Sequence, residues 1–378
     1  MAAKRPEKSR SSGSALPVLS PDSSANVQEV FGIRRDLPRG LLSPGTLFGR
    51  RYRIGERIGS GGMGVVYSAN EVATNDEVAI KVLSASAASP ANVRRFRREG
   101  QTAASVVHRR CCRVLGVGVD RGAAYIVMER LEGETLRRRL NDSGPLSAAD
   151  AVAVMMQLLE GLSAAHAVGV LHRDIKPGNI FLTTPRGVAP SIKIIDFGLA
   201  KLLPPTAWSA REEAPDEEQS AITTTDVVPG TPMYLAPEQI NGERDLDERV
   251  DIWAAGLTFY EMLLNRRAFG GESYVALAHD IVLRALPSLS GQRPDLPVGF
   301  DALLARALAK HRERRFATAA DFRDALLSEW AKFRTAGVAR AEQMRNFRRP
   351  AQTLPTVAEP DLEEPTEINV RVDFEPDG

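Results

Sequence analysis

The stretch from Leu171 to Gly198 constrains this chain more than any other part of its sequence. It contains the run His-Arg-Asp-Ile-Lys-Pro-Gly-Asn, in which an aspartate, a lysine and an asparagine follow one another at short spacing. A pair of short apolar segments then leads to a second aspartate, the first residue of Asp-Phe-Gly. The four polar residues are Asp174, Lys176, Asn179 and Asp196. Their concentration in one stretch predicts that the fold is organised around a polar site here.

These residue types are the ones that phosphoryl transfer requires. The reaction needs a carboxylate near the acceptor hydroxyl, a cation on the moving phosphate, and acidic or amide oxygens that hold magnesium. The stretch supplies all three, first in H-R-D-x-K-x-x-N and then in D-F-G. This order is typical of a catalytic loop that is followed by a metal-binding motif. The sequence therefore predicts a centre for phosphoryl transfer.

Length and composition limit the class of protein. The 378 residues suffice for one large two-lobed domain with tails or for two ordinary domains. The chain is 43% hydrophobic and 26% charged, with a net charge of +1, which is typical of a soluble globular protein and gives no global signal for nucleic acid. No run approaches the roughly 18 apolar residues of a spanning helix. We therefore expect a cytoplasmic protein with neither nucleic-acid nor membrane partners.

The two ends of the chain differ in composition from its middle. Residues 1–47 are rich in Ser, Pro, Gly and basic residues, and such a segment does not bury enough apolar surface to offset its ordering entropy. We expect a disordered leader, with a docking or phosphoacceptor arm as the alternative. Residues 351–378 are acidic and interrupted by prolines. We expect solubilising disorder there, with docking phosphosites at Thr353, Thr356 and Thr366 as the alternative.

A glycine-rich pattern follows Tyr52. The run Gly59-Ser60-Gly61-Gly62-Met63-Gly64 matches G-x-G-x-x-G, a spacing that dinucleotide-binding folds share. In those folds a helix opens at the glycines, whereas Val65-Val66-Tyr67 has the composition of a strand. A glycine loop between two strands lets backbone amides cover phosphates from above. The context favours this second interpretation.

Lys81 lies in the otherwise apolar strand Val78-Ala79-Ile80-Lys81. A buried ammonium group is costly unless it is paired, so we expect an acidic partner on a nearby helix. The basic amphipathic segment 92–99 contains one acid, Glu99, which we choose as that partner. The alternative is an edge lysine that faces solvent. The arginines of this helix are expected on a solvated face, or as receptors of a phosphorylated loop.

The chain has two cysteines, adjacent at Cys111 and Cys112, which rules out a disulfide framework. We interpret them as small residues at a turn, with redox sensing as the alternative. The strand that ends at Glu129 precedes a connection that we interpret as a hinge between two lobes, where backbone groups of Glu129 and Leu131 would face an adenine edge.

Beyond the hinge, helical spacing of apolar residues predicts helices over 151–167, after the cap Ser147, and over 250–264. More helices are expected through Ala331, and the periodicity ends after Phe347. Between them, the prolines and acidic run that follow Gly198 predict an exposed loop.

Six segments, taken in order, carry a resemblance: GSGGMGVVY, VAIK, HRDIKPGN, DFG, GTPMYLAPE and DIWAAG. With them the chain resembles the eukaryotic-like (Hanks-type) serine/threonine protein kinases of bacteria, over about Tyr52 to Ala331. The resemblance implies an α+β, bilobal fold over 48–331, with a small β-rich N-lobe (48–130), a larger helical C-lobe (131–331), and ATP and Mg²⁺ between them. Mn²⁺ is the alternative metal. Residues 332–378 would then hold a helix end and the acidic tail.

The resemblance also implies roles for individual residues. Asp174 would accept or orient the hydroxyl proton, and Lys176 would stabilise the γ-phosphate charge. Lys81 would contact the α- and β-phosphates while paired with Glu99. Asn179 and Asp196 would hold magnesium. The other residues expected at the nucleotide are Ile58, Gly59, Ser60, Gly61, Gly62, Met63, Gly64, Val66, Ala79, Glu129, Leu131 and Phe181, of which Val66, Ala79 and Phe181 would sandwich the adenine.

Outside the nucleotide site, the resemblance implies that Glu238 pairs with Arg315 and that Thr231 bonds near Asp174 and Lys176. It also implies regulation. In kinases with an arginine before the catalytic aspartate, here Arg173, a phosphorylated residue of the activation segment meets that charge. Thr223 and Thr225 stand where bacterial relatives carry autophosphorylation sites. We expect protein substrates, autophosphorylation of the chain itself, and pairing of two copies during activation.

The sequence also departs from the family pattern. His108-Arg109-Arg110-Cys111-Cys112 replaces the usual H-P-x-I-V, which puts the packing behind the preceding helix in question. Arg130 replaces the common hinge aromatic. The alternative functions are a pseudokinase scaffold, against which the intact catalytic residues argue, and a small-molecule kinase, against which GTPMYLAPE argues.

Overall fold

Nine strands and eight α-helices make up the described part of the chain. The structure, a computed structural model, describes residues 42–61, 64–86, 90–184, 186–187, 189–197 and 232–347. The strands are β1 (Leu47–Phe48), β2 (Tyr52–Gly61), β3 (Gly64–Glu71), β4 (Glu77–Ser86), β5 (Val114–Asp120), β6 (Ala123–Glu129), β7 (Glu134–Thr135), β8 (Ile180–Leu182) and β9 (Ile192–Ile194). The α-helices are α2 (Pro90–Ala104), α3 (Leu136–Ser143), α4 (Ala148–Ala167), α5 (Pro237–Ile240), α6 (Arg249–Leu264), α7 (Tyr274–Leu283), α8 (Gly299–Ala307) and α9 (Ala319–Phe347).

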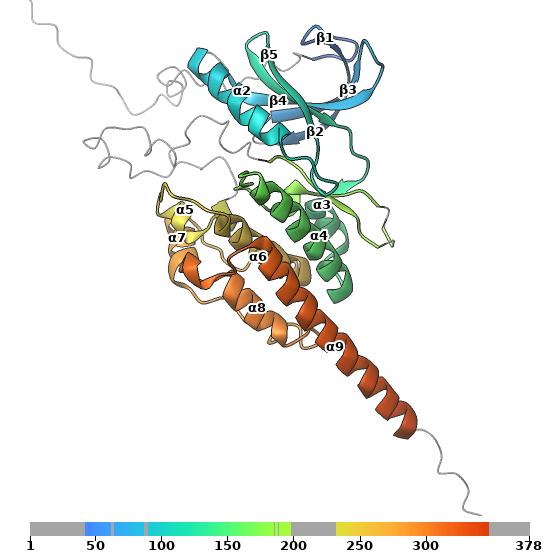
Figure 1. The fold of residues 1–378 in the computed structure, drawn as a ribbon, viewed down its shortest axis with the longest axis vertical. Coiled ribbons are helices and arrows are strands. Elements are labelled where there is room, and N and C mark those ends of the chain that lie inside the picture. The colour runs from blue at the N-terminus through green and yellow to red at the C-terminus, as the bar shows by residue number, and fades with distance from the viewer. Residues whose placement is uncertain are drawn as a thin grey trace, which may run out of the picture. The chain divides into compact units, whose positions relative to one another are not determined.

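The N-lobe is an antiparallel sheet with the strand order β1-β2-β3-β4-β6-β5, and α2 lies beside it (Figure 1). β2 and β3 pair up to their tip, where Gly61 faces Gly64. The described glycines of this run therefore belong to two paired strands, which confirms the prediction and excludes a helix that opens at Gly64 as in a dinucleotide fold. Gly62 and Met63 lie outside the described residues.

Alternation along the strands places Lys81 on one particular face of the sheet. Successive residues of a strand point to opposite faces. Ile80 and Val82 enter one core cluster, whereas Leu83 enters the other together with Phe96 of α2. Lys81 is two residues from Leu83, so its side chain points to the same face of the sheet, the face that α2 covers. The buried position that the sequence predicts for this ammonium group is confirmed, because Lys81 is 6% exposed.

Glycine is required at position 64. Gly64 has φ = +148°, in a region that L side chains rarely adopt, and a Cβ atom there would lie 2.1 Å from the carbonyl oxygen of Val82. Any side chain would therefore push β3 away from β4. This glycine allows the start of β3 to lie close to β4, the strand that carries Lys81.

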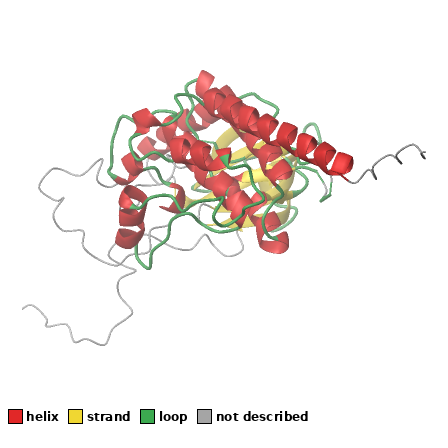
Figure 2. Cartoon of the chain, turned by 90° about the horizontal axis from the view of Figure 1, so that it is seen from below, coloured by secondary structure: helices red, strands yellow, loops and turns green. Residues whose placement is uncertain are grey.

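The C-lobe is built around α4 and α6. Both helices are largely apolar and both contribute fully buried residues, including Leu158 of α4 and Trp253 of α6. The hydroxyl of Ser147 accepts a hydrogen bond from the backbone N–H of Asp150, which confirms the predicted helix cap. Seen from below, helices cover this lobe and the strands lie behind them (Figure 2).

The catalytic stretch lies on a small second sheet. β8 pairs with β7 on one side and with β9 on the other, with Ile180 opposite Ile194. The alternation buries Ile180, Leu182, Ile192 and Ile194. Asp174, Lys176 and Asn179 precede β8, and Asp196 follows β9. Because β8 and β9 are antiparallel, the start of one and the end of the other meet at the same edge of the sheet.

The first described residues of the chain already pack into the N-lobe. Leu42 packs into the N-lobe core with Phe48 and Tyr52, so the packed residues begin before residue 48. α9 ends at Phe347, where the sequence periodicity ends. The chain divides into two units, residues 1–326 and 327–378. The expected leader up to residue 41, the acidic loop within 198–231 and the acidic tail lie outside the described residues.

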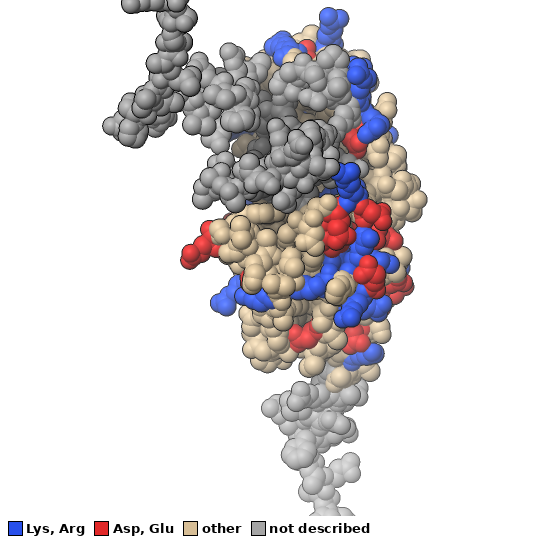
Figure 3. Space-filling view, turned by 90° about the vertical axis from the view of Figure 1, so that its left-hand side faces the viewer, with Lys and Arg blue, Asp and Glu red and all other residues tan. Residues whose placement is uncertain are grey.

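Charges of both signs are interspersed on the face shown in Figure 3. Among the described helices, α4 is the one whose length and composition would allow it to cross a membrane, with a mean hydropathy of 1.3. Half of that window is buried inside the structure. Burial of this kind is typical of a core helix, so the match is weak support for a membrane segment.

Candidate active site

The carboxylate of Asp174 is held by two neighbours from its own loop. The Nζ atom of Lys176 lies 2.9 and 2.7 Å from its two oxygens. The side-chain amide of Asn179 donates to Oδ2 at 2.9 Å and to the backbone carbonyl of Asp174 at 2.7 Å. These bonds fix the orientation of a carboxylate whose side chain is 17% exposed. The three residues that the sequence singled out therefore form one hydrogen-bonded group.

The backbone beside Asp174 is held in an uncommon conformation. Arg173 has φ = +66°, and so has Asp196. Non-glycine residues adopt such angles rarely, and they persist where surrounding contacts impose them. For Arg173 the contact is Asp251 of α6, whose Oδ1 accepts from the Arg173 backbone N–H at 2.7 Å and whose Oδ2 accepts from that of His172 at 2.8 Å.

Asp251 is itself fully buried and is balanced by a histidine. The Nε2 atom of His166 on α4 lies 2.8 Å from Oδ2 of Asp251. Its Nδ1 atom lies 3.1 Å from the carboxylate of Glu248 but does not form a hydrogen bond with it. Burial alone would raise the pKa of Asp251, but the hydrogen bond and charge of His166 hold it below its usual range. A permanent anion therefore anchors the catalytic loop to α6.

His172 joins the two ends of the site. Its Nε2 lies 2.9 Å from the carbonyl oxygen of Ile195, and its Nδ1 accepts from the backbone N–H of Asp174 at 3.2 Å. Its ring meets that of Phe197 edge-on, with centroids 4.8 Å apart. These bonds connect the loop of Asp174 directly with the segment that carries Asp196.

Lys81 reaches across from the N-lobe to Asp196. Its Nζ lies 2.7 Å from Oδ2 of Asp196, with both side chains largely buried. The expected ion pair between Lys81 and Glu99 is not formed in this structure. The Glu99 carboxylate lies instead 3.2 Å from the guanidinium of Arg98, which is mostly exposed. The acid that the described structure brings to the ammonium group is Asp196, and the pair with Glu99 stays a prediction.

Two of the residues expected around the adenine, Val66 and Ala79, share one face of the N-lobe sheet. Val66 stands directly opposite Lys81 in the β3–β4 register, and Ala79 precedes Lys81 by two positions on β4. Opposite residues and residues two apart share a face. Phe181 lies on β8. Ile58 is among the exposed large hydrophobic residues, on β2.

At the predicted hinge, the backbone N–H of Glu129 is already used, because it donates to the carbonyl of Arg113 at 3.0 Å. The backbone of Leu131 makes no hydrogen bond within the described residues. Adenine recognition at the hinge would therefore rest on the Glu129 carbonyl and on the backbone of Leu131. The Glu129 carboxylate is paired with Lys193 at 2.6 Å.

The donor set suits magnesium. Asn179 uses its amide nitrogen for Asp174, which leaves its amide oxygen available, and Asp196 commits one carboxylate oxygen to Lys81. Mg²⁺ prefers oxygen ligands and is commonly held by one or two carboxylates together with substrate phosphates. The described residues contain no cluster of three His, Cys, Asp or Glu side chains, and Mg²⁺ held by Asn179 and Asp196 would take phosphate oxygens and waters as its other ligands.

The unusual segment after α2 packs well. The carboxylate of Glu160 on α4 pairs with the guanidinium groups of Arg109 at 2.6 Å and Arg110 at 3.3 Å. The backbone N–H of Ile194 on β9 donates to the carbonyl oxygen of Arg110, and its carbonyl oxygen accepts from the backbone N–H of Cys112. Burial raises the pKa of both cysteine thiols, Cys111 and Cys112, to about 12. Thiolates are the reactive form, so this environment favours the structural interpretation of the two cysteines.

The expected pair between Glu238 and Arg315 is confirmed. Two parallel hydrogen bonds of 2.6 and 2.8 Å join the buried side chains. Nearby, Arg137 of α3 donates to Glu261 and to the hydroxyl of Tyr234, both at 2.7 Å. These pairs attach the segment 232–240 to the rest of the C-lobe.

Some predicted residues lie outside the described part of the chain: Gly62, Met63, Thr223, Thr225 and Thr231. Sequence reasoning missed the bracing role of Asp251 and His166. One signal was present, because an aspartate at the start of a helix as apolar as α6 must find partners. Nothing in the sequence pointed to His166.

The described site has two main parts. Lys81 of the N-lobe sheet pairs with Asp196, and the carboxylate of Asp174 is held by Lys176 and Asn179. Together with the two-lobed fold, this arrangement defines the catalytic core of a protein kinase. Residues 52–330 match the family model described as protein kinase domain. The chain belongs to the protein kinase family, and within it to the Hanks-type serine/threonine kinases of bacteria.

Several curated relatives are similar to this chain. A probable serine/threonine-protein kinase of Corynebacterium efficiens is 39% identical over 280 residues, which cover 72% of this chain and 40% of that protein. The serine/threonine-protein kinase Pkn1 of Myxococcus xanthus is 37% identical over 73% of this chain and 38% of its own length. For PknB of Mycobacterium tuberculosis the values are 35%, 72% and 42%. The chain thus spans about 40% of the length of these relatives.

Solved structures share the fold. The PknI kinase domain of Mycobacterium tuberculosis matches with a TM-score of 0.55 and 27% identity, covering 76% of this chain and 98% of that domain. Rad53 residues 1–466 in complex with AMP-PNP matches with a TM-score of 0.57 and 25% identity, covering 72% and 64%. The bilobal α+β fold that the sequence predicts is confirmed.

Proposed function

We propose that this chain is a serine/threonine protein kinase that transfers the γ-phosphate of ATP to hydroxyl groups of proteins. The observation that carries the proposal is the oriented carboxylate of Asp174, held by Lys176 and Asn179. The names of the relatives support serine and threonine as acceptors. The AMP-PNP complex of Rad53 supports a nucleotide donor.

In this proposal each residue of the site has one task. Asp174 accepts the proton of the substrate hydroxyl and orients its oxygen. Lys176, which already contacts Asp174, places a positive charge where the transferred group becomes more negative. Lys81 holds the α- and β-phosphates, and Asn179 and Asp196 hold the metal. When bound, Mg²⁺ neutralises phosphate charge, and Mn²⁺ can take the same oxygen ligands.

Lys81 must change partner for this arrangement. An ammonium group bound to Asp196 occupies a carboxylate that the metal also needs. We therefore propose that the pair between Lys81 and Glu99 forms in the active state. It releases Asp196 for Mg²⁺ and holds Lys81 toward the phosphates.

We further propose activation by autophosphorylation at Thr223 and Thr225, which lie outside the described residues. A phosphate at either position would face the charge of Arg173 and order the segment before Thr231. Two copies of the chain would meet during activation. The cytoplasm is the proposed compartment, since ATP is the donor and both cysteines are free thiols.

The test is a transfer assay with labelled ATP and either Mg²⁺ or Mn²⁺. Wild type should label itself and a threonine-containing peptide, whereas Lys81→Ala and Asp174→Asn should not. The full-length Asp174→Asn protein, mixed with wild type, reports transfer between copies. Threonine-to-alanine changes at 223 and 225 should lower the activity strongly. Unchanged turnover would remove the autophosphorylation proposal, and absence of any transfer by wild type would remove the kinase proposal.

A further inference from the structure

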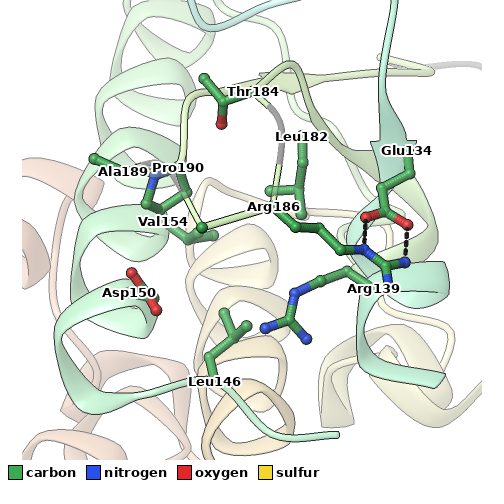
Figure 4. Close-up of a pocket in the computed structure, with 11 residues that line it drawn as sticks. Glu134, Arg139, Leu146, Asp150, Val154, Leu182, Thr184, Arg186, Ala189 and Pro190 are labelled. Carbon is green, nitrogen blue, oxygen red and sulfur yellow. Dashed lines mark hydrogen bonds and ion pairs between the residues drawn. The ribbon is translucent and has the colours of Figure 1, made fainter. Parts of the chain in front are cut away.

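A pocket of about 170 Å³ lies on the C-lobe, away from the catalytic residues. It is formed by α3, the start of α4, and the turn between β8 and β9 (Figure 4). Its described lining residues are Glu134, Arg139, Leu146, Asp150, Val154, Leu182, Thr184, Arg186, Gly187, Ala189 and Pro190. None of these belongs to the site of Asp174 and Asp196.

The guanidinium of Arg139 points into this pocket (Figure 4). Its Nη1 atom is buried and has no hydrogen-bond partner. Burying such a donor without a partner is unfavourable, and more so for a charged group. The unpaired nitrogen therefore marks a position where a ligand acceptor would complete the site.

The other guanidinium group that lines the pocket, that of Arg186, is already paired with carboxylates. Arg186 donates to both oxygens of Glu134, at 2.7 Å each, and to Asp142 at 2.9 Å. Asp150 accepts from the hydroxyl of Ser147 at 2.9 Å. Arg139 is thus the guanidinium group of this pocket that no described carboxylate pairs with, and its open Nη1 donor calls for a ligand acceptor, for which an anion has the complementary charge.

The lining selects among anions. A guanidinium group matches a planar carboxylate, which it can bind through two parallel hydrogen bonds. The carboxylates of Glu134 and Asp150 at the same pocket repel a doubly charged phosphate more strongly than a singly charged carboxylate. Apolar walls are provided by Leu146, Val154 and Leu182, which are all buried. They suit an aliphatic stem or an aliphatic neighbour of the anion.

We propose that this pocket is a docking site for an acidic side chain, flanked by aliphatic residues, in a segment of a protein partner. The choice of a protein segment over a free small acid rests on the proposed function, since a protein kinase must engage protein chains. A contact outside the catalytic residues would raise the local concentration of such a chain at the site of transfer.

The test measures binding without nucleotide, so its outcome is independent of catalysis. The probes are fluorescent nonapeptides with blocked ends, in which a central Glu, Gln or phosphoserine has leucine on both sides. Fluorescence anisotropy is recorded with wild type, Arg139→Leu and Arg138→Leu. Arg138 is the matched control, because it lies on the same helix but is mostly exposed. Thermal melting checks that both variants fold.

The glutamate peptide should bind wild type. The glutamine peptide, and the glutamate peptide with Arg139→Leu, should each bind about ten-fold more weakly or worse, as expected for a lost charge-assisted hydrogen bond. Arg138→Leu should change the affinity by less than about three-fold. Both variants should still transfer phosphate to a short peptide.

Four outcomes would overturn the docking site. They are no binding of the glutamate peptide, equal affinity for the glutamate and glutamine peptides, tighter binding of the phosphoserine peptide, and displacement by free glutarate at the concentration at which the peptide itself competes. The last two would indicate a phosphate site and a small-molecule site. A protein that binds the peptide but transfers no phosphate would contradict the proposed function alone.

Discussion

The carboxylate of Asp251 accepts a hydrogen bond from the backbone N–H of Arg173 at 2.7 Å. One residue further along the chain is Asp174, so an anion buried in α6 fixes the backbone that aims the catalytic carboxylate. Arg173 has a positive φ, a conformation that would relax if this bond were lost. The position of the catalytic loop thus depends on a residue that does not face the substrate.

Replacement of Asp251 by Asn should therefore damage catalysis as well as stability. The amide keeps the size of the side chain but loses its charge and one acceptor. We expect unfolding free energy to fall by roughly 2 to 4 kcal/mol, because charge-assisted hydrogen bonds to buried groups are lost. The transfer rate of the folded variant should fall by more than about ten-fold. Urea unfolding and peptide phosphorylation measure the two effects, and a folded variant with wild-type turnover would contradict the bracing role.

His166 should make the stability of this anchor depend on pH. Burial alone would lower its pKa, but the hydrogen bond and charge of Asp251, together with the charge of Glu248, raise the pKa above its usual value. Because the pKa of His166 is raised in the folded state, its pairing contributes fully to the unfolding free energy below about pH 6.5. This contribution is lost as the pH rises through the pKa of the folded state. His166→Gln should flatten this part of the stability profile. Parallel profiles for wild type and variant would exclude the effect.

The partner exchange of Lys81 leads to a separate prediction. Among the side chains that the structure describes, Glu99 pairs with the exposed Arg98, so Glu99→Gln should change the unfolding free energy by less than about 1 kcal/mol. If the pair with Lys81 forms during transfer, the same variant should lose at least about ten-fold in turnover. Lys81→Met provides the reference for a complete loss. Wild-type turnover of Glu99→Gln would show that Lys81 needs no second acid.

The buried pair between Glu238 and Arg315 should contribute strongly to stability. Both side chains are almost fully buried, and Arg315 also donates to the carbonyl oxygens of Ala309 and Arg249. Removing one partner of a buried pair leaves the other charge uncompensated, which costs roughly 3 to 5 kcal/mol. Glu238→Gln should therefore lower the urea midpoint markedly. The exposed pair of Arg323 and Asp324 is the matched control, and equal effects of Glu238→Gln and Asp324→Asn would contradict this estimate.

The sequence predicted the local patterns better than the contacts between distant residues. The strands around Gly61 and Gly64, the cap at Ser147 and the end of α9 at Phe347 follow from nearby residues alone. The partner of Lys81 does not, because the sequence offers more than one acid, and only the folded structure shows that Asp196 lies beside the ammonium group. The pocket at Arg139 was likewise invisible, since it joins residues from α3, α4 and a turn much later in the chain.

Lys310 should give the protein an unusual gain in stability at alkaline pH. Its Nζ donates to the carbonyl oxygen of Ile281 and lies over the rings of Trp253 and Phe269. Burial lowers the pKa of Lys310 to about 8 from a usual value of 10.5. Between these values the unfolded chain binds more protons than the folded one, so unfolding free energy rises with pH. Relative to Lys310→Met, wild type should gain roughly 1 to 3 kcal/mol across this range. The subtraction removes the opposite contribution of the two buried cysteines, whose raised pKa values lower stability at high pH. Urea unfolding at several pH values measures the difference, and a difference that stays constant with pH would contradict the prediction.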